Sequence, residues 1–435
     1  MKKKEVVKSL IHEFHHRDLP RFVSREVYIP LGLEKIVTLI GPRRSGKTFR
    51  LYQIIAELIR TLAKENIIFL NLEDERLDFE VQDLDLIIQG YRELYPEKDI
   101  SNCVFFFDEI QNVPGWEQFI RRVYDTISRH IFITGSNAKM LSSEIATSLR
   151  GRSISYEVFP LSFREYLSFH NITYDRYLPE IQAKVYNHIE NYIEYGGFPE
   201  LATIRDEEVK NKILQEYYQV MLFRDLVDHY EIKNIVALKY FLKRLFASAA
   251  KEVSVNRIFN DLKSANIKIS KNTLYLFLEY AETIFLVKTL PKYSGKLPLR
   301  EFGERKIFVI DTGLLNSIIF RFTADRGKAM EQVVYWELRR RTDRIFFMKN
   351  GFECDFITID SRGTKKGAIQ VCLDLSDPVT RKREVKGLVA ACANLDLDRG
   401  TIISFDEKEE FMDHGIEVRI IPLSEFLCEE DALQM

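Results

Sequence analysis

A chain of 435 residues is too long for one ordinary hydrophobic core, so we expect two or three domains. Its 63 basic and 65 acidic residues nearly balance, and no apolar run reaches the roughly 18 residues of a membrane span. The overall charge therefore gives no indication of a nucleic-acid partner, and the apolar pattern excludes a membrane-spanning helix.

Two further features concern the cellular compartment. The basic start, "MKKKEVVKSLIHEF", lacks the apolar core of a signal peptide. Five scattered cysteines without a C-x-x-C pair argue against a zinc site or a disulfide framework. We expect a soluble cytoplasmic protein with reduced thiols.

The first predicted elements are the strand Ile36–Ile40, a glycine-rich loop and an amphipathic helix. The loop has the G-x-x-x-x-G-K-T pattern, whose backbone N–H groups can surround phosphates at the start of a helix. We expect Lys47 to reach the β- and γ-phosphates of ATP and Thr48 to coordinate Mg²⁺. A coincidental glycine turn is the alternative, and the flanking strand and helix disfavour it. The predicted nucleotide-binding residues of the loop are Gly41, Pro42, Arg43, Arg44, Ser45, Gly46, Lys47 and Thr48.

A second strand with an acidic end follows in "CVFFFDEIQ". Its continuous apolar run is typical of a buried parallel strand. We expect Asp108 to complete the nucleotide site as a Mg²⁺ ligand and Glu109 to polarise the attacking water. Alone, such a pair could simply cap the following helix, but the upstream loop favours the catalytic interpretation.

Polar residues also follow the next predicted strand, "HIFITGSNAKML". Asn137, with Ser136 before it, could orient the attacking water or cap a helix, and both interpretations stay open. Arg150 and Arg152 lie beyond a further helix. Either could act as an arginine finger on a neighbouring subunit, or serve only the solubility of the surface.

Together, "GPRRSGKT", "FLNLEDERL", "FFFDEIQ", "ITGSNAKML", "LRGR", "PLSFREYL" and "YGGFPE" resemble a prokaryotic AAA+ ATPase family joined to a nuclease-like C-terminal domain. The resemblance covers nearly the whole chain and is specific in the first 200 residues. It implies an α/β P-loop core over 1–160, a helical lid with connecting helices over 161–232, and ATP between them. It also implies homo-oligomers, commonly rings.

Residues 233–300 are strongly basic, with thirteen Lys and Arg against four Asp and Glu, a net charge of +9. Three predicted helices, capped by Asn234, Ser254 and Ser270, precede a strand–wing–strand pattern. This is winged-helix order, and we place a winged-helix module at 233–310. The alternative is a packing module with a merely solvated basic face.

Duplex or branched DNA is the predicted partner of this module. The third helix would present its first residues to a major groove, and the wing would carry lysines toward phosphates. The candidate DNA-binding residues are Lys271, Asn272, Tyr275, Lys292 and Lys296.

The last segment, 311–435, resembles PD-(D/E)XK nucleases, in which carboxylates on a helix and two strands hold Mg²⁺. The resemblance implies Glu331 as the helix acid and Asp355 as the acid of the first strand. Two departures weaken it. Gln370 stands where the second strand acid belongs, and Cys372 stands where the lysine belongs. We expect a nuclease fold that has lost cleavage rather than an active nuclease.

The favoured function is therefore a Mg²⁺-dependent ATPase that couples ATP binding and hydrolysis to DNA binding or remodelling. A nucleotide-controlled regulatory switch and an ATP-regulated nuclease remain as alternatives.

Overall fold

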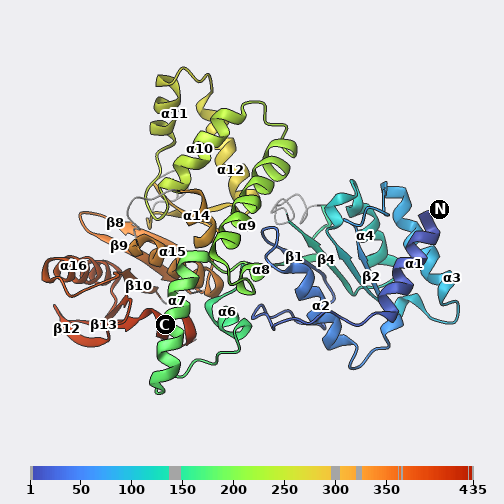
Figure 1. The fold of residues 1–435 in the computed structure, drawn as a ribbon, viewed down its shortest axis with the longest axis horizontal. Helices are drawn as coiled ribbons and strands as arrows, with labels where there is room; N and C mark the ends of the chain where they lie inside the picture. The colour runs from blue at the N-terminus through green and yellow to red at the C-terminus, as the bar shows by residue number, and fades with distance from the viewer. Residues whose placement is uncertain are drawn as a thin grey trace. The chain divides into compact units, whose positions relative to one another are not determined.

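The computed structural model describes residues 3–136, 148–294, 304–319, 326–360, 362–363, 366–429 and 431–433. The chain divides into two compact units (Figure 1). Residues 1–159 with 283–285 make the first unit, and 160–282 with 286–435 make the second. Segment 161–232, predicted as a lid, thus groups with the second unit.

The first unit is built on a five-stranded parallel sheet with the order β2-β3-β4-β1-β5. The predicted α/β fold with a buried parallel sheet is confirmed. Its strands are β1 (Ile36–Ile40), β2 (Ile67–Asn71), β3 (Val104–Asp108), β4 (Ile131–Gly135) and β5 (Ser153–Glu157). Its helices include α1 (Lys3–His16), α2 (Lys47–Leu58), α3 (Asp85–Leu94) and α4 (Trp116–Thr126).

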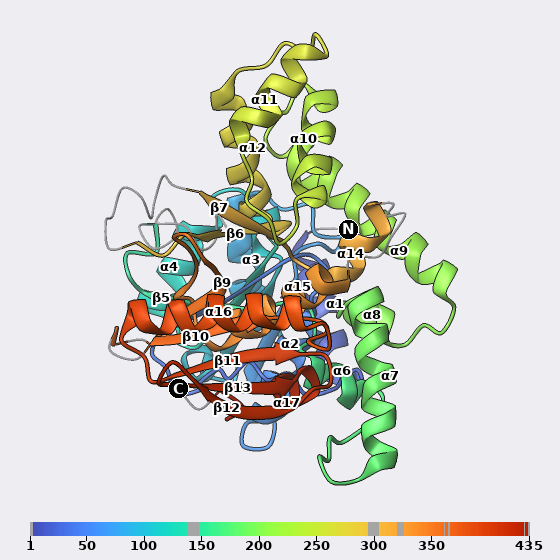
Figure 2. The ribbon, with the colours of Figure 1, turned by 90° about the vertical axis from the view of Figure 1, so that its left-hand side faces the viewer.

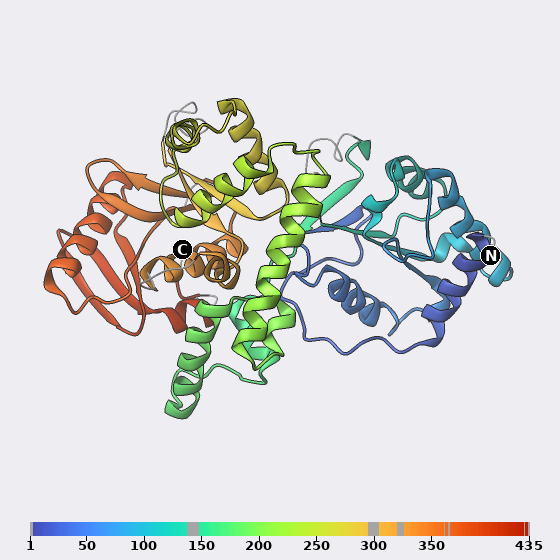
Figure 3. The ribbon, with the colours of Figure 1, turned by 45° about the horizontal axis from the view of Figure 1, so that its top comes forward.

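Helices cover both faces of this sheet (Figure 3). Because side chains alternate along a strand, Phe106 of β3 packs in the core beneath α2, whereas Phe107 meets Phe119 of α4 on the other face. Burial on both faces explains why the strands read as continuous apolar runs.

The second unit begins with helices. They are α6 (Phe163–Phe169), α7 (Pro179–Tyr195), α8 (Pro199–Ala202) and α9 (Glu207–Val220), which continues as a π-helix over Met221–Asp228. Next come α10 (Ile235–Ala247), α11 (Val255–Ser264), α12 (Lys271–Thr283) and the antiparallel pair β6 (Val287–Pro291) and β7 (Arg305–Val309).

The predicted caps of three of these helices are confirmed. The side chains of Asn234, Ser254 and Ser270 accept hydrogen bonds from the N–H groups of Ala237, Arg257 and Thr273.

A six-stranded mixed sheet with the order β12-β13-β11-β10-β9-β8 forms the rest of this unit (Figure 2). Helix α16 lies along one face of it, and the apolar residues of that helix fill the core there. The strands are β8 (Ile345–Lys349), β9 (Glu353–Ile359), β10 (Lys366–Val371), β11 (Arg399–Ser404), β12 (Glu409–Asp413) and β13 (Ile416–Pro422). The helices are α14 (Thr312–Ile318), α15 (Arg326–Arg341), α16 (Pro378–Leu395) and α17 (Leu423–Cys428).

The "YGGFPE" segment lies at the end of α7. Its glycines closely contact the residues at the start of α14. The Asp311 carboxylate is buried and accepts hydrogen bonds from the N–H groups of Gly197 (2.7 Å) and Leu314 (3.0 Å). Gly196 has φ 75°, and a Cβ built there would lie 2.0 Å from Asp311 Oδ1. The glycine is required both by its backbone conformation and by the neighbouring carboxylate.

We predict that Gly196→Ala lowers the free energy of unfolding by about 3 kcal/mol or more, because backbone strain and a steric clash add. Gly415→Ala is the matched control. Gly415 also has a positive φ, 81°, but a Cβ there meets nothing within 4 Å, so the loss should be about 1 kcal/mol. Urea unfolding measures both. Equal losses would contradict the role assigned to the contact with Asp311.

Candidate functional site

The glycine-rich loop is tightly packed between β1 and α2. Gly46 precedes α2 with φ 94°, and Gly41 has φ 151°. A Cβ on Gly41 would lie 2.2 Å from the carbonyl oxygen of Val158, so only glycine fits at the end of β1. Lys47 is only 4% exposed, and its Nζ donates to the carbonyl oxygens of Gly41 (3.2 Å) and Pro42 (3.0 Å).

Asp108 lies at the centre of a hydrogen-bond network at the carboxyl ends of the strands. The Thr48 hydroxyl donates to Asp108 Oδ2 at 2.7 Å, and the Thr134 hydroxyl donates to Oδ1 at 2.6 Å. Thr134 Oγ1 also accepts the N–H of Glu109 at 2.8 Å. Burial raises the pKa of Asp108 to about 6. A nearby cation would favour the charged carboxylate and reverse that effect.

Glu109 is positioned beside the lysine of the loop. Its backbone is left-handed, with φ 51°, and its Oε1 lies 3.8 Å from Lys47 Nζ. The Gln111 side chain donates to the other carboxylate oxygen and lies 3.4 Å from Ser136 Oγ. Asn137 lies outside the residues that the structure describes.

The donor set fits a nucleoside triphosphate with Mg²⁺. Ser45 Oγ is buried and has no hydrogen-bond partner among the described residues, so it is available to a ligand oxygen. The start of α2 supplies N–H groups and the positive end of a helix dipole. Thr48 and Asp108 supply oxygens suited to Mg²⁺, and Lys47 supplies the positive charge.

Arg25, which was not predicted from the sequence, contacts the backbone of this loop. Its guanidinium donates to the carbonyl oxygens of Ser45 (2.6 Å) and Phe159 (2.7 Å), and its backbone N–H donates to Gln53 Oε1. Thr134 was also missed, because one hydroxyl within an apolar strand gives no recognisable signal.

The two arginines proposed as fingers differ in their environment. Arg152 makes two contacts with the Asp125 carboxylate, at 2.8 and 3.1 Å, within the first unit. Arg150 is exposed and has φ 51°. Of the two, Arg150 is the better placed to meet another molecule.

The candidate DNA-binding residues at the start of α12 are exposed. Lys271, Asn272 and Tyr275 are all exposed, with Tyr275 at 53%. Lys292 Nζ lies 3.5 Å from Glu304 Oε2. Lys296 lies outside the described part of the chain.

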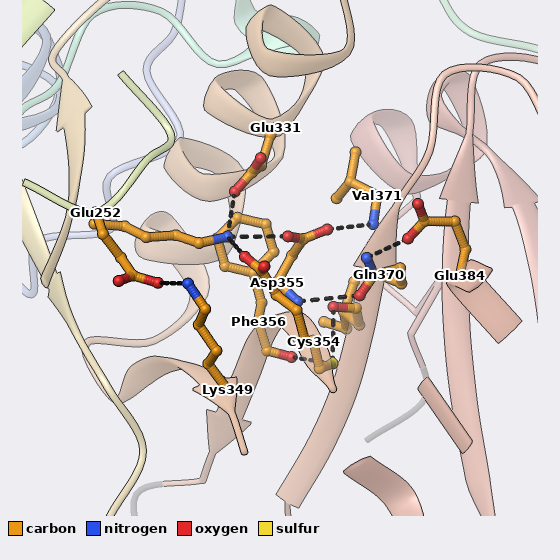
Figure 4. A network of polar contacts seen from close by, with 12 residues as sticks. Glu252, Glu331, Lys349, Cys354, Asp355, Phe356, Gln370, Val371 and Glu384 are labelled. Carbon is orange, nitrogen blue, oxygen red and sulfur yellow. Dashed lines mark hydrogen bonds and ion pairs between the residues drawn. The ribbon is translucent and has the colours of Figure 1, made fainter. Parts of the chain in front are cut away.

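The nuclease-like residues Glu331, Asp355 and Gln370 come together from α15, β9 and β10 (Figure 4). Lys306 of β7, which sequence reasoning missed, lies among the carboxylates, 3.0 Å from both Glu331 Oε1 and Asp355 Oδ1. Burial alone would lower the pKa of Lys306, but the surrounding carboxylates raise it. Over the described residues, no group of three or more His, Cys, Asp or Glu is arranged to hold a metal ion.

Cys372, at the position expected for a lysine, is 8% exposed, and burial raises the pKa of its thiol to about 11. It is a small buried side chain and supplies no positive charge. No helix within the described ranges is both long and apolar enough to cross a membrane.

Two family models match separate parts of the chain. Residues 33–167 match an AAA domain, and residues 186–325 match a domain of unknown function, DUF8612. Two solved structures show weak similarity. AMPPCP-bound DnaA from Aquifex aeolicus is 15% identical, with 64% of this chain and 86% of that chain covered and a TM-score of 0.26. CDC6P from Pyrobaculum aerophilum is 13% identical, with 69% and 88% covered and a TM-score of 0.26.

Two relatives are similar over most of their length. The uncharacterized protein MJ1544 of Methanocaldococcus jannaschii is 37% identical over 385 residues, which covers 87% of this chain and 83% of that protein. An uncharacterized protein of Haemophilus influenzae is 31% identical over 350 residues, which covers 78% and 82%. The chain therefore belongs to the family of MJ1544, and its residues 33–167 match an AAA domain.

Proposed function

We propose that this chain is a Mg²⁺-dependent ATPase that couples ATP binding and hydrolysis to DNA binding or remodelling. The observation that carries the ATPase part is the network of Thr48, Asp108 and Thr134 beside the buried Lys47. This supports the proposal, because a candidate cation ligand, a candidate phosphate-binding lysine and a candidate base lie together at one edge of the parallel sheet.

Each of these side chains has a distinct role. Lys47 would exchange its carbonyl partners for phosphate oxygens, and Thr48 and Asp108 would hold Mg²⁺, which would neutralise phosphate charge. Glu109 positions the attacking water, and Thr134 fixes the backbone N–H of Glu109 relative to Asp108. Arg150, exposed beyond β4, is the candidate finger toward a second copy of the chain in a homo-oligomer.

The DNA part of the proposal is supported by charge and by the order of the elements. Helices α10, α11 and α12 followed by the β6–β7 pair have the order of a winged helix, and residues 233–300 carry a net charge of +9. Exposed Lys271, Asn272 and Tyr275 combine a cation, an amide and an aromatic ring on one helix face.

Two substitutions test the ATP site. Lys47→Ala should abolish hydrolysis and weaken ATP binding, because the charge that faces the phosphates is lost. Glu109→Gln should retain ATP binding but lower kcat by on the order of 100-fold or more, because the amide is a poor base. Nucleotide binding and phosphate release measure the two effects separately, and Lys98→Ala, outside the loop, is the control. Normal turnover by Glu109→Gln would show that Glu109 is not the catalytic carboxylate.

Charge reversal tests the DNA-binding surface. Lys271→Glu and Lys292→Glu should each weaken duplex binding and reduce the salt slope by about one counterion, because a phosphate contact is lost. Lys212→Glu is the matched control, since Lys212 is an exposed lysine of α9 outside the basic module. If Lys212→Glu had the same effect as the other two, the proposed DNA surface would be wrong.

A further inference from the structure

Lys306 is a buried lysine surrounded by carboxylates from two other elements. Its Nζ lies 3.0 Å from Glu331 Oε1, 3.1 Å from Glu353 Oε1 and 3.0 Å from Asp355 Oδ1, and the residue is 2% exposed. Glu331 comes from α15, whereas Glu353 and Asp355 share one face of β9. The ammonium thus meets as many carboxylates as it has N–H donors.

The distances from the Lys306 nitrogen to these oxygens are typical of an ammonium group and are longer than those from a divalent metal ion to its ligands. Mg²⁺ binds oxygen at about 2.1 Å and Ca²⁺ at about 2.3–2.6 Å, whereas these oxygens surround the nitrogen at 3.0–3.1 Å. A metal ion could enter this position only if Lys306 left it and the carboxylates moved inward.

Two further oxygens of the nuclease-like set, on Asp355 and Gln370, already accept hydrogen bonds. Asp355 Oδ2 accepts the N–H of Val371 at 3.1 Å. Gln370 Oε1 accepts the N–H of Asp355 at 3.1 Å, and its amide nitrogen donates to Glu384 Oε2 at 2.5 Å. Gln370 Oε1 would have to replace the missing carboxylate oxygen as a metal ligand, but it is bonded to the backbone instead. Glu331, Asp355 and Gln370 do not fit Mg²⁺ in this arrangement.

Lys306 comes from a different part of the chain than its partner carboxylates, which lie on α15 and β9. It lies on β7, next to the basic helices, and a single β-bridge pairs it with Glu252. Lys292, near the end of β6, forms another bridge with Phe347 of β8. The β6–β7 pair is thus joined to the six-stranded sheet both by backbone contacts and by the buried lysine.

We propose that Lys306 is a tethered cation that replaces a divalent metal ion in the cluster of Glu331, Glu353 and Asp355. The cluster then holds the β6–β7 pair against the C-terminal sheet and does not cleave nucleic acid. This inference is independent of the ATPase proposal, because it concerns a separate centre in the second unit.

Binding of Mn²⁺ to the nucleotide-free full chain, measured by calorimetry, tests the proposal. Lys306→Ala should gain one Mn²⁺ site per chain, at least about tenfold tighter than any binding by the wild type, because it exposes the carboxylates to a hard cation. Adding Asp355→Asn to that variant should remove the site. Lys349→Ala removes a neighbouring lysine, which pairs with Glu252 and lies opposite Glu353 in the β8–β9 register, but it leaves Lys306 in place and should gain none.

Three results of these binding and cleavage measurements would overturn the proposal. One is wild-type Mn²⁺ binding at this cluster, recognised by its loss in Asp355→Asn. Another is Mn²⁺-dependent DNA cleavage by the wild type that Asp355→Asn abolishes. The third is a folded Lys306→Ala variant that gains no site.

Stability gives a second readout in case Lys306→Ala folds poorly. Its unfolding temperature should be lower than that of the wild type and rise again with Mn²⁺ but not with NaCl, because only a bound ion replaces the lost charge. A variant with Lys306→Met, Glu331→Gln and Asp355→Asn removes the cation and two carboxylates together. It should fold and show no response to Mn²⁺. If this neutral variant failed to fold, or if Mn²⁺ did not restore Lys306→Ala, the role of Lys306 as a replacement cation would be refuted.

Discussion

The hydrogen bonds that Asp108 accepts from Thr48 and Thr134 are the constraint on which the nucleotide site depends. They exist because β4 lies between β1 and β3 in a parallel sheet, so the carboxyl ends of three strands meet at one edge. The network joins the glycine-rich loop, the acidic strand end and the next strand into one unit. Burial of Asp108 makes its charge costly until a cation is bound beside it.

A second buried centre, in the C-terminal part of the chain, also brings carboxylates out of water, but with a lysine of the chain among them. Glu331 and Asp355 are nearly buried, and each has a carboxylate oxygen 3.0 Å from the ammonium nitrogen of Lys306, a cation from within the chain. At the first centre the hydroxyl groups of Thr48 and Thr134 contact Asp108, and we propose that a bound cation balances its charge. This contrast is the basis of the two proposals, an exchangeable ion at the first centre and a fixed ammonium at the second.

The sequence predicted the elements and residues whose signal is local. The P-loop, the strand Ile36–Ile40 and three helix caps all follow from patterns within a few residues. Lys306 could not be predicted, because its partners lie 25 to 49 residues away and only the folded sheet brings them together. For the same reason the hydrogen bonds of Gln370 were not foreseen, although its position on β10 was.

Steady-state ATP hydrolysis by the purified chain, with and without duplex and branched DNA at two salt concentrations, tests the coupling most directly. We predict that DNA substantially raises the rate of ATP hydrolysis and that this stimulation weakens as salt rises, because the basic module binds phosphates electrostatically. A slow rate that is indifferent to DNA at both salt concentrations would contradict it and would favour a nucleotide-controlled switch.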